Sequence, residues 1–193
     1  MVRTASTMLP LGSVAPAFAL PDVTTGETLT VETFAGKAGL LVIFMCRHCP
    51  FVIHVQDELA RIGAEFVPQS LGMIGISSNS VVTHPADAPD KLKEMVAELG
   101  FNFPIAYDAS QEVAKSYQAA CTPDFFLFDQ DFKLVYRGQL DDSRPGNDQP
   151  VDGKDLRQAI AAVLANKPVD PDQKPSIGCN IKWTPGNEPD YFG

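Results

Sequence analysis

The sequence predicts an α/β fold with parallel strands at its centre, and three consecutive segments carry that prediction. Residues 40–45 are apolar on both faces and rich in branched side chains, which is typical of a buried strand. From Pro50 to Phe66, apolar side chains recur at three- and four-residue spacing, as on one face of a helix. Residues 71–77 are again apolar and predict a second buried strand. Strand, helix and strand in this order form the unit that builds parallel sheets.

The remaining expected elements are shorter and follow from turn signals and apolar spacing. Before the first buried strand we expect an extended lead-in over residues 12–22 and a short strand over residues 27–31. After the second we expect a loop over 81–89, a helix over 91–99, a strand over 103–107 and a helix over 111–119. The last expected elements are a hairpin of strands over 125–128 and 134–137, a polar loop over 141–152 and an amphipathic helix over 155–165.

The 193 residues suffice for one domain with extensions, whose core needs no disulfide or metal to hold it. We divide the chain into a domain over residues 1–165 and a Pro-rich C-terminal tail over residues 166–193. The tail shows neither a helical nor a strand pattern. It nevertheless contains Trp183 and several other large apolar side chains, so we expect part of it to pack on the domain.

The charge of the chain excludes some partners. It has 24 acidic and 15 basic residues, a net charge of −9, and no basic run, so we expect no binding to nucleic acid. Its longest apolar run, residues 40–46, is far shorter than the roughly 20 residues of a membrane span, so we expect no membrane partner. The N-terminal segment lacks the apolar stretch of a signal peptide, and we expect a cytoplasmic protein. Thiols are mostly reduced there, so a cysteine pair indicates catalysis, redox chemistry or metal binding.

Cys46 and Cys49 are the strongest functional signal. A strand is expected to end at Cys46 and a helix to begin there or just after, with Pro50 at an early helical position. Two cysteines three residues apart on the first turn share a face, at a separation that a disulfide can close. Unpaired N–H groups and the helix dipole would lower the pKa of Cys46. We therefore predict Cys46 as the attacking thiol and the more shielded Cys49 as the resolving thiol.

The same spacing also occurs in zinc knuckles, which need two further ligands, usually another close pair. The other cysteines, Cys121 and Cys179, are isolated, because neither has a Cys or His within four residues. We therefore favour redox chemistry and predict no bound metal. The chain has no glycine motif for a dinucleotide or a phosphate, so we predict no organic cofactor.

Three segments together resemble the thioredoxin superfamily. They are Gly-Ser-Val-Ala-Pro-x-Phe-x-Leu-Pro-Asp at residues 12–22, Cys-Arg-His-Cys-Pro at residues 46–50 and Thr-Pro-Asp-Phe-Phe-Leu-Phe at residues 122–128. The lead-in is similar to the peroxiredoxin-like (AhpC/TSA, redoxin) branch, and the resemblance covers roughly residues 10–165. Residues 174–183 resemble the tail of a redoxin subfamily with the same Cys-x-His-Cys-Pro site. The resemblance implies a thioredoxin-like fold, a central mixed sheet flanked by helices, with an N-terminal extension and a C-terminal tail.

The resemblance also implies that Pro123 is a cis-proline that faces the redox pair and positions the substrate chain beside it. His48, directly before the second cysteine, can stabilise a Cys46 thiolate by charge or hydrogen bond and make the couple more oxidising. The alternative is that His48 is an exposed loop residue without such an effect.

The chain departs from its relatives where they handle protons and peroxide. Thioredoxins carry a buried acid six residues before the first cysteine, a position held here by Leu40. Proton transfer must then use another group or water; Asp124 is a candidate, and its alternative role is a solvated or N–H-capping carboxylate. Peroxiredoxins need a Pro and a Thr at positions held here by Gly39 and Ile43, which puts a peroxide pocket in doubt.

Two further thiols are candidates for the site. Cys121 lies two residues before Pro123 and is either a third thiol at the site or a small buried apolar residue. Cys179 lies in the tail and either reaches back to form a second disulfide or stays a free thiol.

We therefore predict a thiol–disulfide oxidoreductase in which Cys46 and Cys49 exchange disulfides, His48 tunes the thiolate and Pro123 positions the partner. The expected substrates are protein or small-molecule disulfides and thiols, and the expected electron donor is an upstream thioredoxin or a low-molecular-weight thiol. One alternative is a thiol peroxidase with Cys46 as the peroxidatic residue. The other is a non-catalytic protein that binds a thiophilic metal or senses the redox state.

Overall fold

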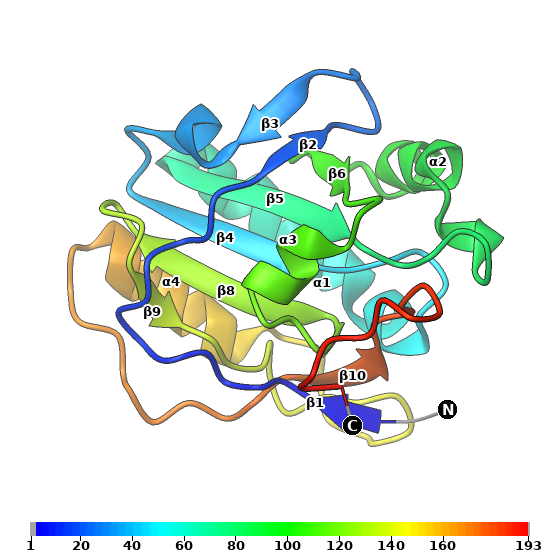
Figure 1. The fold of residues 1–193 in the computed structure, drawn as a ribbon. Helices are drawn as coiled ribbons and strands as arrows, with labels where there is room; N and C mark the ends of the chain where they lie inside the picture. The colour runs from blue at the N-terminus through cyan, green and yellow to red at the C-terminus, as the bar shows by residue number, and fades with distance from the viewer. Residues whose placement is uncertain (1–2, 193) are drawn as a thin grey trace.

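A five-stranded mixed sheet forms the centre of the computed structural model, which describes residues 3–192 (Figure 1). The strand order is β6-β5-β4-β8-β9. The bounds are β4 Gly39–Phe44, β5 Leu71–Ser77, β6 Ile105–Tyr107, β8 Asp124–Asp129 and β9 Leu134–Tyr136. β4, β5 and β6 run parallel, whereas β8 and β9 are antiparallel to their neighbours. The expected strand–helix–strand unit is thus the centre of the sheet.

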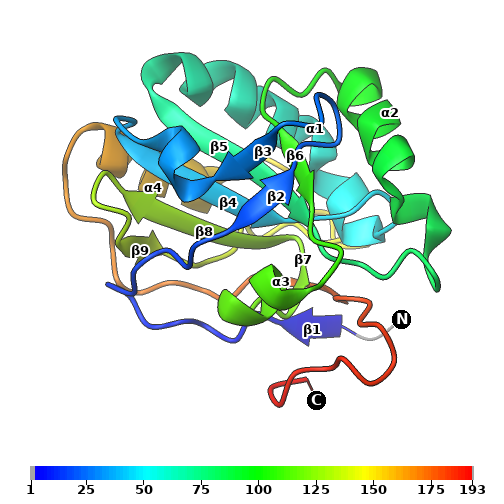
Figure 2. The same ribbon diagram turned by 45° about the horizontal axis from the view of Figure 1, so that its top comes forward.

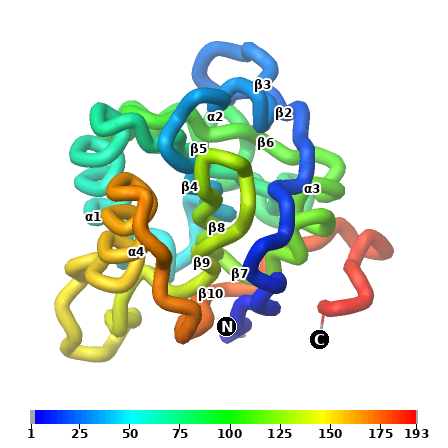
Figure 3. Tube along the Cα trace, turned by 90° about the vertical axis from the view of Figure 1, so that its left-hand side faces the viewer, coloured from blue at the N-terminus to red at the C-terminus, as the bar shows by residue number. Residues whose placement is uncertain are grey.

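Helices cover both faces of this sheet, and the view along it in Figure 3 separates the layers. The long helix α1 (Pro50–Phe66) and α4 (Lys154–Leu164) lie on one side, and the short helix α3 (Glu112–Ser116) lies on the other. The helix α2 (Pro89–Leu99) contributes its buried side chains to the same core as α1. Short 3-10 turns occur at η1 Val31–Phe34, η2 Val67–Gln69 and η3 Pro85–Asp87. Within residues 3–192, none of the helices is long and apolar enough to cross a membrane.

Alternation along the central strands divides the core into two halves. In β4, Leu41 and Ile43 pack with α1, whereas Val42 and Phe44 pack on the opposite face. Because every residue of β4 is buried, the strand is apolar on both faces, which is what its sequence predicted.

Two smaller sheets complete the fold. The hairpin β2 (Ala19–Pro21) and β3 (Thr28–Thr30) lies beyond the edge strand β6 (Figure 2). A second, antiparallel sheet joins β1 (Arg3–Ala5), β10 (Ile177–Asn180) and β7 (Cys121–Thr122), in the order β1-β10-β7. This sheet brings segments from both ends of the chain together beside the end of β8.

The structure differs from the sequence expectations at two places outside the site. The tail contains the strand β10, although its sequence showed no strand pattern. The reason is that β10 has only four residues, and its partners lie far away in the chain. The helix expected over 111–119 is cut to α3, because Gln111 and Gln118 adopt left-handed backbone angles at its two ends.

Candidate active site

Cys46 and Cys49 lie where β4 ends and α1 begins. The helix begins at Pro50, whose fixed φ and missing N–H suit a first helical turn. Cys49 is therefore the N-cap, and its carbonyl accepts the N–H groups of Val52 and Ile53. We expected both cysteines on the first turn of the helix, and this was wrong: only Cys49 lies at the helix N-terminus, and Cys46 lies in the loop before it.

The loop with the cis-proline faces this pair. The peptide bond between Thr122 and Pro123 is cis, as the resemblance implied. The Sγ atom of Cys46 lies 3.6 Å from Oγ1 of Thr122, and the Cys49 thiol donates to the Thr122 carbonyl at 3.2 Å. Both cysteines are fully buried, so shielding from solvent, which we expected for Cys49, does not distinguish them.

The two thiols act oppositely on each other's pKa. The neighbouring Cys49 thiol, together with burial and the charge of Asp87, raises the pKa of Cys46 well above its ordinary value. The Cys46 thiol lowers the pKa of Cys49 to about 4, against the effect of burial, and Thr122 and the Cys179 thiol contribute to that lowering. The two titrations are thus coupled, because a proton on one sulfur stabilises negative charge on the other.

These directions differ from the sequence expectation, in which the helix N-terminus lowers the pKa of Cys46. Cys49, not Cys46, lies at the helix N-terminus. The Val52 N–H is already bonded to the Cys49 carbonyl at 3.0 Å, so the neighbouring Cys46, Thr122 and Cys179 side chains contribute more to the lowering at Cys49.

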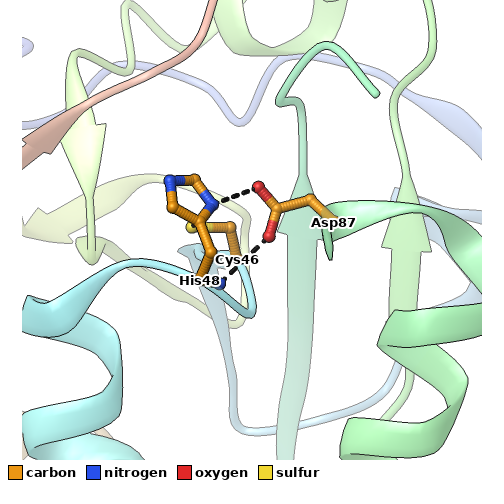
Figure 4. Close-up of side chains that lie close together, drawn as sticks. All are labelled: Cys46, His48 and Asp87. Atoms are coloured by element: carbon orange, nitrogen blue, oxygen red, sulfur yellow. Dashed lines mark hydrogen bonds and ion pairs between the residues drawn. The ribbon is translucent and has the colours of Figure 1, made fainter. Parts of the chain in front are cut away.

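Asp87 is a residue of the site that sequence reasoning missed. Its carboxylate is fully buried, and Oδ1 accepts the backbone N–H of Arg47 at 2.9 Å and that of His48 at 3.1 Å. Its Oδ2 lies 2.6 Å from Nδ1 of His48 (Figure 4) and accepts the amide N–H of Asn79 at 2.8 Å. Burial raises the pKa of Asp87, but the hydrogen bonds from His48 and Asn79 outweigh burial and lower it. Asp87 thus holds the loop between the two cysteines.

His48 directs one ring nitrogen at two neighbours. Its Nδ1 also lies 3.8 Å from Sγ of Cys46. Because the carboxylate of Asp87 can only accept, Nδ1 carries the proton, and the contact with Cys46 is the longer and weaker one. The ring is partly exposed, at 26% of its side-chain surface, and its centroid lies 4.7 Å from that of the His84 ring, with the two planes tilted by 30°. The Nδ1–H of His48 is therefore directed at Asp87, and the Cys46 sulfur is a second, longer contact of the same nitrogen.

The same three side chains form the one cluster with metal-ligand character that residues 3–192 contain. The ligand-type atoms of Cys46, His48 and Asp87 all lie within 4.8 Å of one another. The Asp87 oxygens already accept four hydrogen bonds, and an ion would have to replace the proton between His48 and Asp87. Hydrogen bonding accounts for the cluster, so we treat it as part of the thiol site.

The other two cysteines differ in their contacts. Cys121 is buried, its thiol donates to the carbonyl of Pro123 at 3.5 Å, and burial raises its pKa. Cys179 lies on β10 and belongs to the same buried core cluster as Cys46 and Cys49. Burial and the neighbouring Cys49 raise the pKa of Cys179 to about 12. The fold thus brings Cys179 close to the redox pair.

Asp124 lies on the other side of the sheet from the pair. Side chains alternate along β8, so Asp124 shares the face of Phe126, whereas Phe125 packs in the core that contains the cysteines. Its Oδ2 accepts the N–H of Ala120 at 3.2 Å and lies 3.7 Å from Nη2 of the buried Arg137. These contacts match the N–H-capping alternative, and a role in proton transfer stays a prediction.

Comparisons with known proteins agree with this architecture. Residues 11–137 match the profile of the AhpC/TSA family. An uncharacterized conserved protein from Geobacillus kaustophilus is 49% identical, with a TM-score of 0.94 over 96% of this chain and 98% of that one. The thiol-disulfide oxidoreductase ResA of Bacillus anthracis is 25% identical over 132 residues, 65% of this chain and 67% of the relative. The thioredoxin domain of a Bacteroides vulgatus thiol-disulfide oxidoreductase is 23% identical, with a TM-score of 0.57 over 67% of this chain and 88% of that one. The expected thioredoxin-like fold is confirmed.

Proposed function

Because the chain belongs to the AhpC/TSA family, we propose that it is a thiol–disulfide oxidoreductase that works through Cys46 and Cys49. The observation that carries the proposal is the pair of buried, free thiols that both contact Thr122, directly before the cis-proline. The likeness to ResA, which is named a thiol-disulfide oxidoreductase, supports the same reaction class.

In the proposed cycle, Cys46 attacks a substrate disulfide while its proton passes to the Cys49 thiolate. A mixed disulfide forms on Cys46, and the other substrate sulfur leaves as a thiolate. Cys49 gives the proton to that leaving thiolate and attacks the Cys46 sulfur, which closes the Cys46–Cys49 disulfide and releases the second substrate sulfur. Cys49 thus acts both as the base and as the resolving thiol. It takes the role of proton acceptor, which Leu40, at the position of the buried acid of thioredoxins, cannot fill.

The surrounding residues take positioning roles in this proposal. Pro123 shapes the loop that faces the two thiols and positions the substrate at them. The N–H of His48 stabilises negative charge on Cys46 during attack, and Asp87 orients that N–H. The substrates are protein or small-molecule disulfides and thiols, and a thioredoxin or a low-molecular-weight thiol of the cytoplasm supplies electrons.

The test of the reaction uses the reduced full chain and glutathione disulfide. We expect the wild type to lose two hydrogens and form a Cys46–Cys49 link, detected by mass spectrometry after acid quenching. Cys46→Ser should slow glutathionylation or oxidation by about 100-fold or more, because it removes the attacking sulfur. Cys121→Ser is the matched control and should react like the wild type.

Hydrogen peroxide separates the proposal from the peroxidase alternative. We expect peroxide to be consumed no faster than by a free thiol. Fast peroxide consumption that depends on Cys46, without exchange with glutathione disulfide, would overturn the proposed reaction.

The role of His48 gives a separate prediction. His48→Ser should make the Cys46–Cys49 couple less oxidising, by about 30 mV or more, because a donor to the reduced form is lost. Equilibration in glutathione redox buffers measures the potential. His84→Ser, which removes the neighbouring ring but no contact with Cys46, is the control. Equal potentials in all three proteins would remove His48 from the mechanism.

A further inference from the structure

The tail strand β10 lies along β7, directly beside the cis-proline. Cys179 pairs with Thr122, and Asn180 pairs with Cys121, in antiparallel register. On its other edge β10 pairs with β1, where Cys179 is opposite Arg3. The backbone of the tail is therefore held on both sides, and Cys179 is placed opposite the residue that both Cys46 and Cys49 contact.

Close contacts fix this segment to the cis-proline loop. The hydroxyl of Ser176 donates to the carbonyl of Pro123 at 2.7 Å, and the N–H of Ile181 donates to the carbonyl of Ala120 at 3.1 Å. Between them, Gly178 approaches the Thr122 backbone so closely that a Cβ would lie 2.6 Å from the Thr122 carbonyl carbon. Only a glycine permits this close approach. Because Cys179 directly follows Gly178, the approach also fixes the position of Cys179.

Cys179 meets the redox pair from that position. Helix α1 contacts β10, and Cys46, Cys49 and Cys179 belong to one buried core cluster. The closeness of Cys49 and Cys179 also shows in their pKa values, since Cys179 lowers that of Cys49 and Cys49 raises that of Cys179. Cys179 is only 3% exposed, so its reaction partners lie inside the protein.

We propose that Cys179 is a third redox-active cysteine, which takes the disulfide over from Cys46 by bonding to Cys49. The inference rests on the proposed Cys46–Cys49 exchange. The Cys179 sulfur attacks the Cys49 sulfur of the Cys46–Cys49 disulfide. The Cys49–Cys179 bond forms, the Cys46–Cys49 bond breaks, and Cys46 leaves as a thiolate that takes the proton of Cys179. One disulfide replaces another, so the step needs neither an oxidant nor a reductant.

The exchange has a direct consequence for turnover. It returns Cys46 to the thiol form while the protein still stores one disulfide. Because the stored bond joins the N-terminus of α1 to β10, it also ties the tail to the domain in the oxidised state. Cys121 pairs with Asn180 rather than with Cys179, and its thiol donates to the Pro123 carbonyl.

The experiment uses Cys46→Ser, which keeps Cys49 and Cys179. After equilibration with glutathione disulfide, acid quenching, alkylation and proteolysis, mass spectrometry should find a Cys49–Cys179 link in most chains. The double variant Cys46→Ser/Cys179→Ala should instead keep glutathione on Cys49, and Cys46→Ser/Cys121→Ser should still form the link. Circular dichroism melting confirms that each variant is folded.

Two outcomes separate this inference from the proposed function. If the wild type forms Cys46–Cys49 but Cys46→Ser carries only glutathione on Cys49, the third-thiol inference is overturned and the pair remains. If the wild type forms neither a Cys46–Cys49 nor a Cys49–Cys179 link, the proposed function itself fails. A Cys49–Cys179 link in the oxidised wild type, at a fraction that Cys121→Ser leaves unchanged, supports the relay.

Discussion

Replacing Gly178 with valine will detach β10 from the cis-proline loop and open the thiol site. The new side chain would overlap the Thr122 backbone, which lies 2.6 Å from the Cβ position at its carbonyl carbon. A backbone atom cannot turn aside as a flexible side chain can. Gly178 also pairs with Thr4 of β1, so β10 would leave both of its neighbours. We expect the free energy of unfolding to fall by about 3 kcal/mol.

The reactivity of the cysteines measures the opening. All four are buried, so native wild-type protein should react slowly with iodoacetamide. In Gly178→Val, alkylation of Cys49 and Cys179 should be at least about tenfold faster, because their exposure no longer requires a costly opening. Gly186→Ala is the control, since a Cβ there meets nothing within 4 Å and only the local backbone is strained. If Gly178→Val had the same alkylation rates and melting temperature as the wild type, β10 would not cover the site.

The same strand shows where sequence reasoning ended. The β4–α1–β5 unit and the cysteine pair could be predicted, because apolar spacing and a two-residue gap are local signals. β10 could not, because its four residues gain their hydrogen bonds from β1 and β7, more than 50 residues away. Strand order was therefore predictable only at the centre of the sheet.

Asp87 was missed for the same physical reason. It lies 39 residues after His48, in a segment whose sequence predicted only a loop. The start of the helix was also shifted, because the sequence placed both cysteines on its first turn, whereas Cys49 is the N-cap and Cys46 lies in the loop before it. Element types follow from local patterns, whereas the first residue of a helix is a weaker signal.

Arg137 and Asp124 form a second buried polar pair that the sequence did not reveal. Arg137 is the largest fully buried side chain described, its guanidinium lies 4.6 Å above the ring of Phe126, and its Nη2 is 3.7 Å from Oδ2 of Asp124. Within residues 3–192, Oδ1 of Asp124 and two nitrogens of Arg137 have no hydrogen-bond partner. Burial therefore raises the pKa of Asp124 to about 6, despite the opposing charge of Arg137.

Asp124 should make the protein less stable as the pH rises from 4 to 7. Its pKa is higher in the folded state than the ordinary 3.8, so the folded state binds the proton more tightly. The stabilisation is complete below the unfolded pKa and is lost as the pH rises through the folded pKa, by up to about 3 kcal/mol. In Asp124→Asn this loss should be absent, which urea unfolding at several pH values measures against the wild type. Parallel stability curves for the two proteins would show that Asp124 does not titrate in this range.

Arg137→Met should have the larger effect, because it leaves a buried carboxylate without its cation. We expect the free energy of unfolding at pH 8 to fall by about 3–5 kcal/mol. The pKa of Asp124 would rise further in this variant. Much of the lost stability should therefore be regained near pH 4, where the carboxyl group is neutral. The double variant Arg137→Met/Asp124→Asn should be more stable at pH 8 than Arg137→Met alone. Both charged partners are then replaced, so no unpaired buried charge is left. Asp142→Asn, which removes solvent-accessible ion pairs with Lys154 and Lys174, is the control and should cost about 1 kcal/mol or less. If Arg137→Met were equally unstable at both pH values, lost packing rather than the unpaired charge would govern its effect.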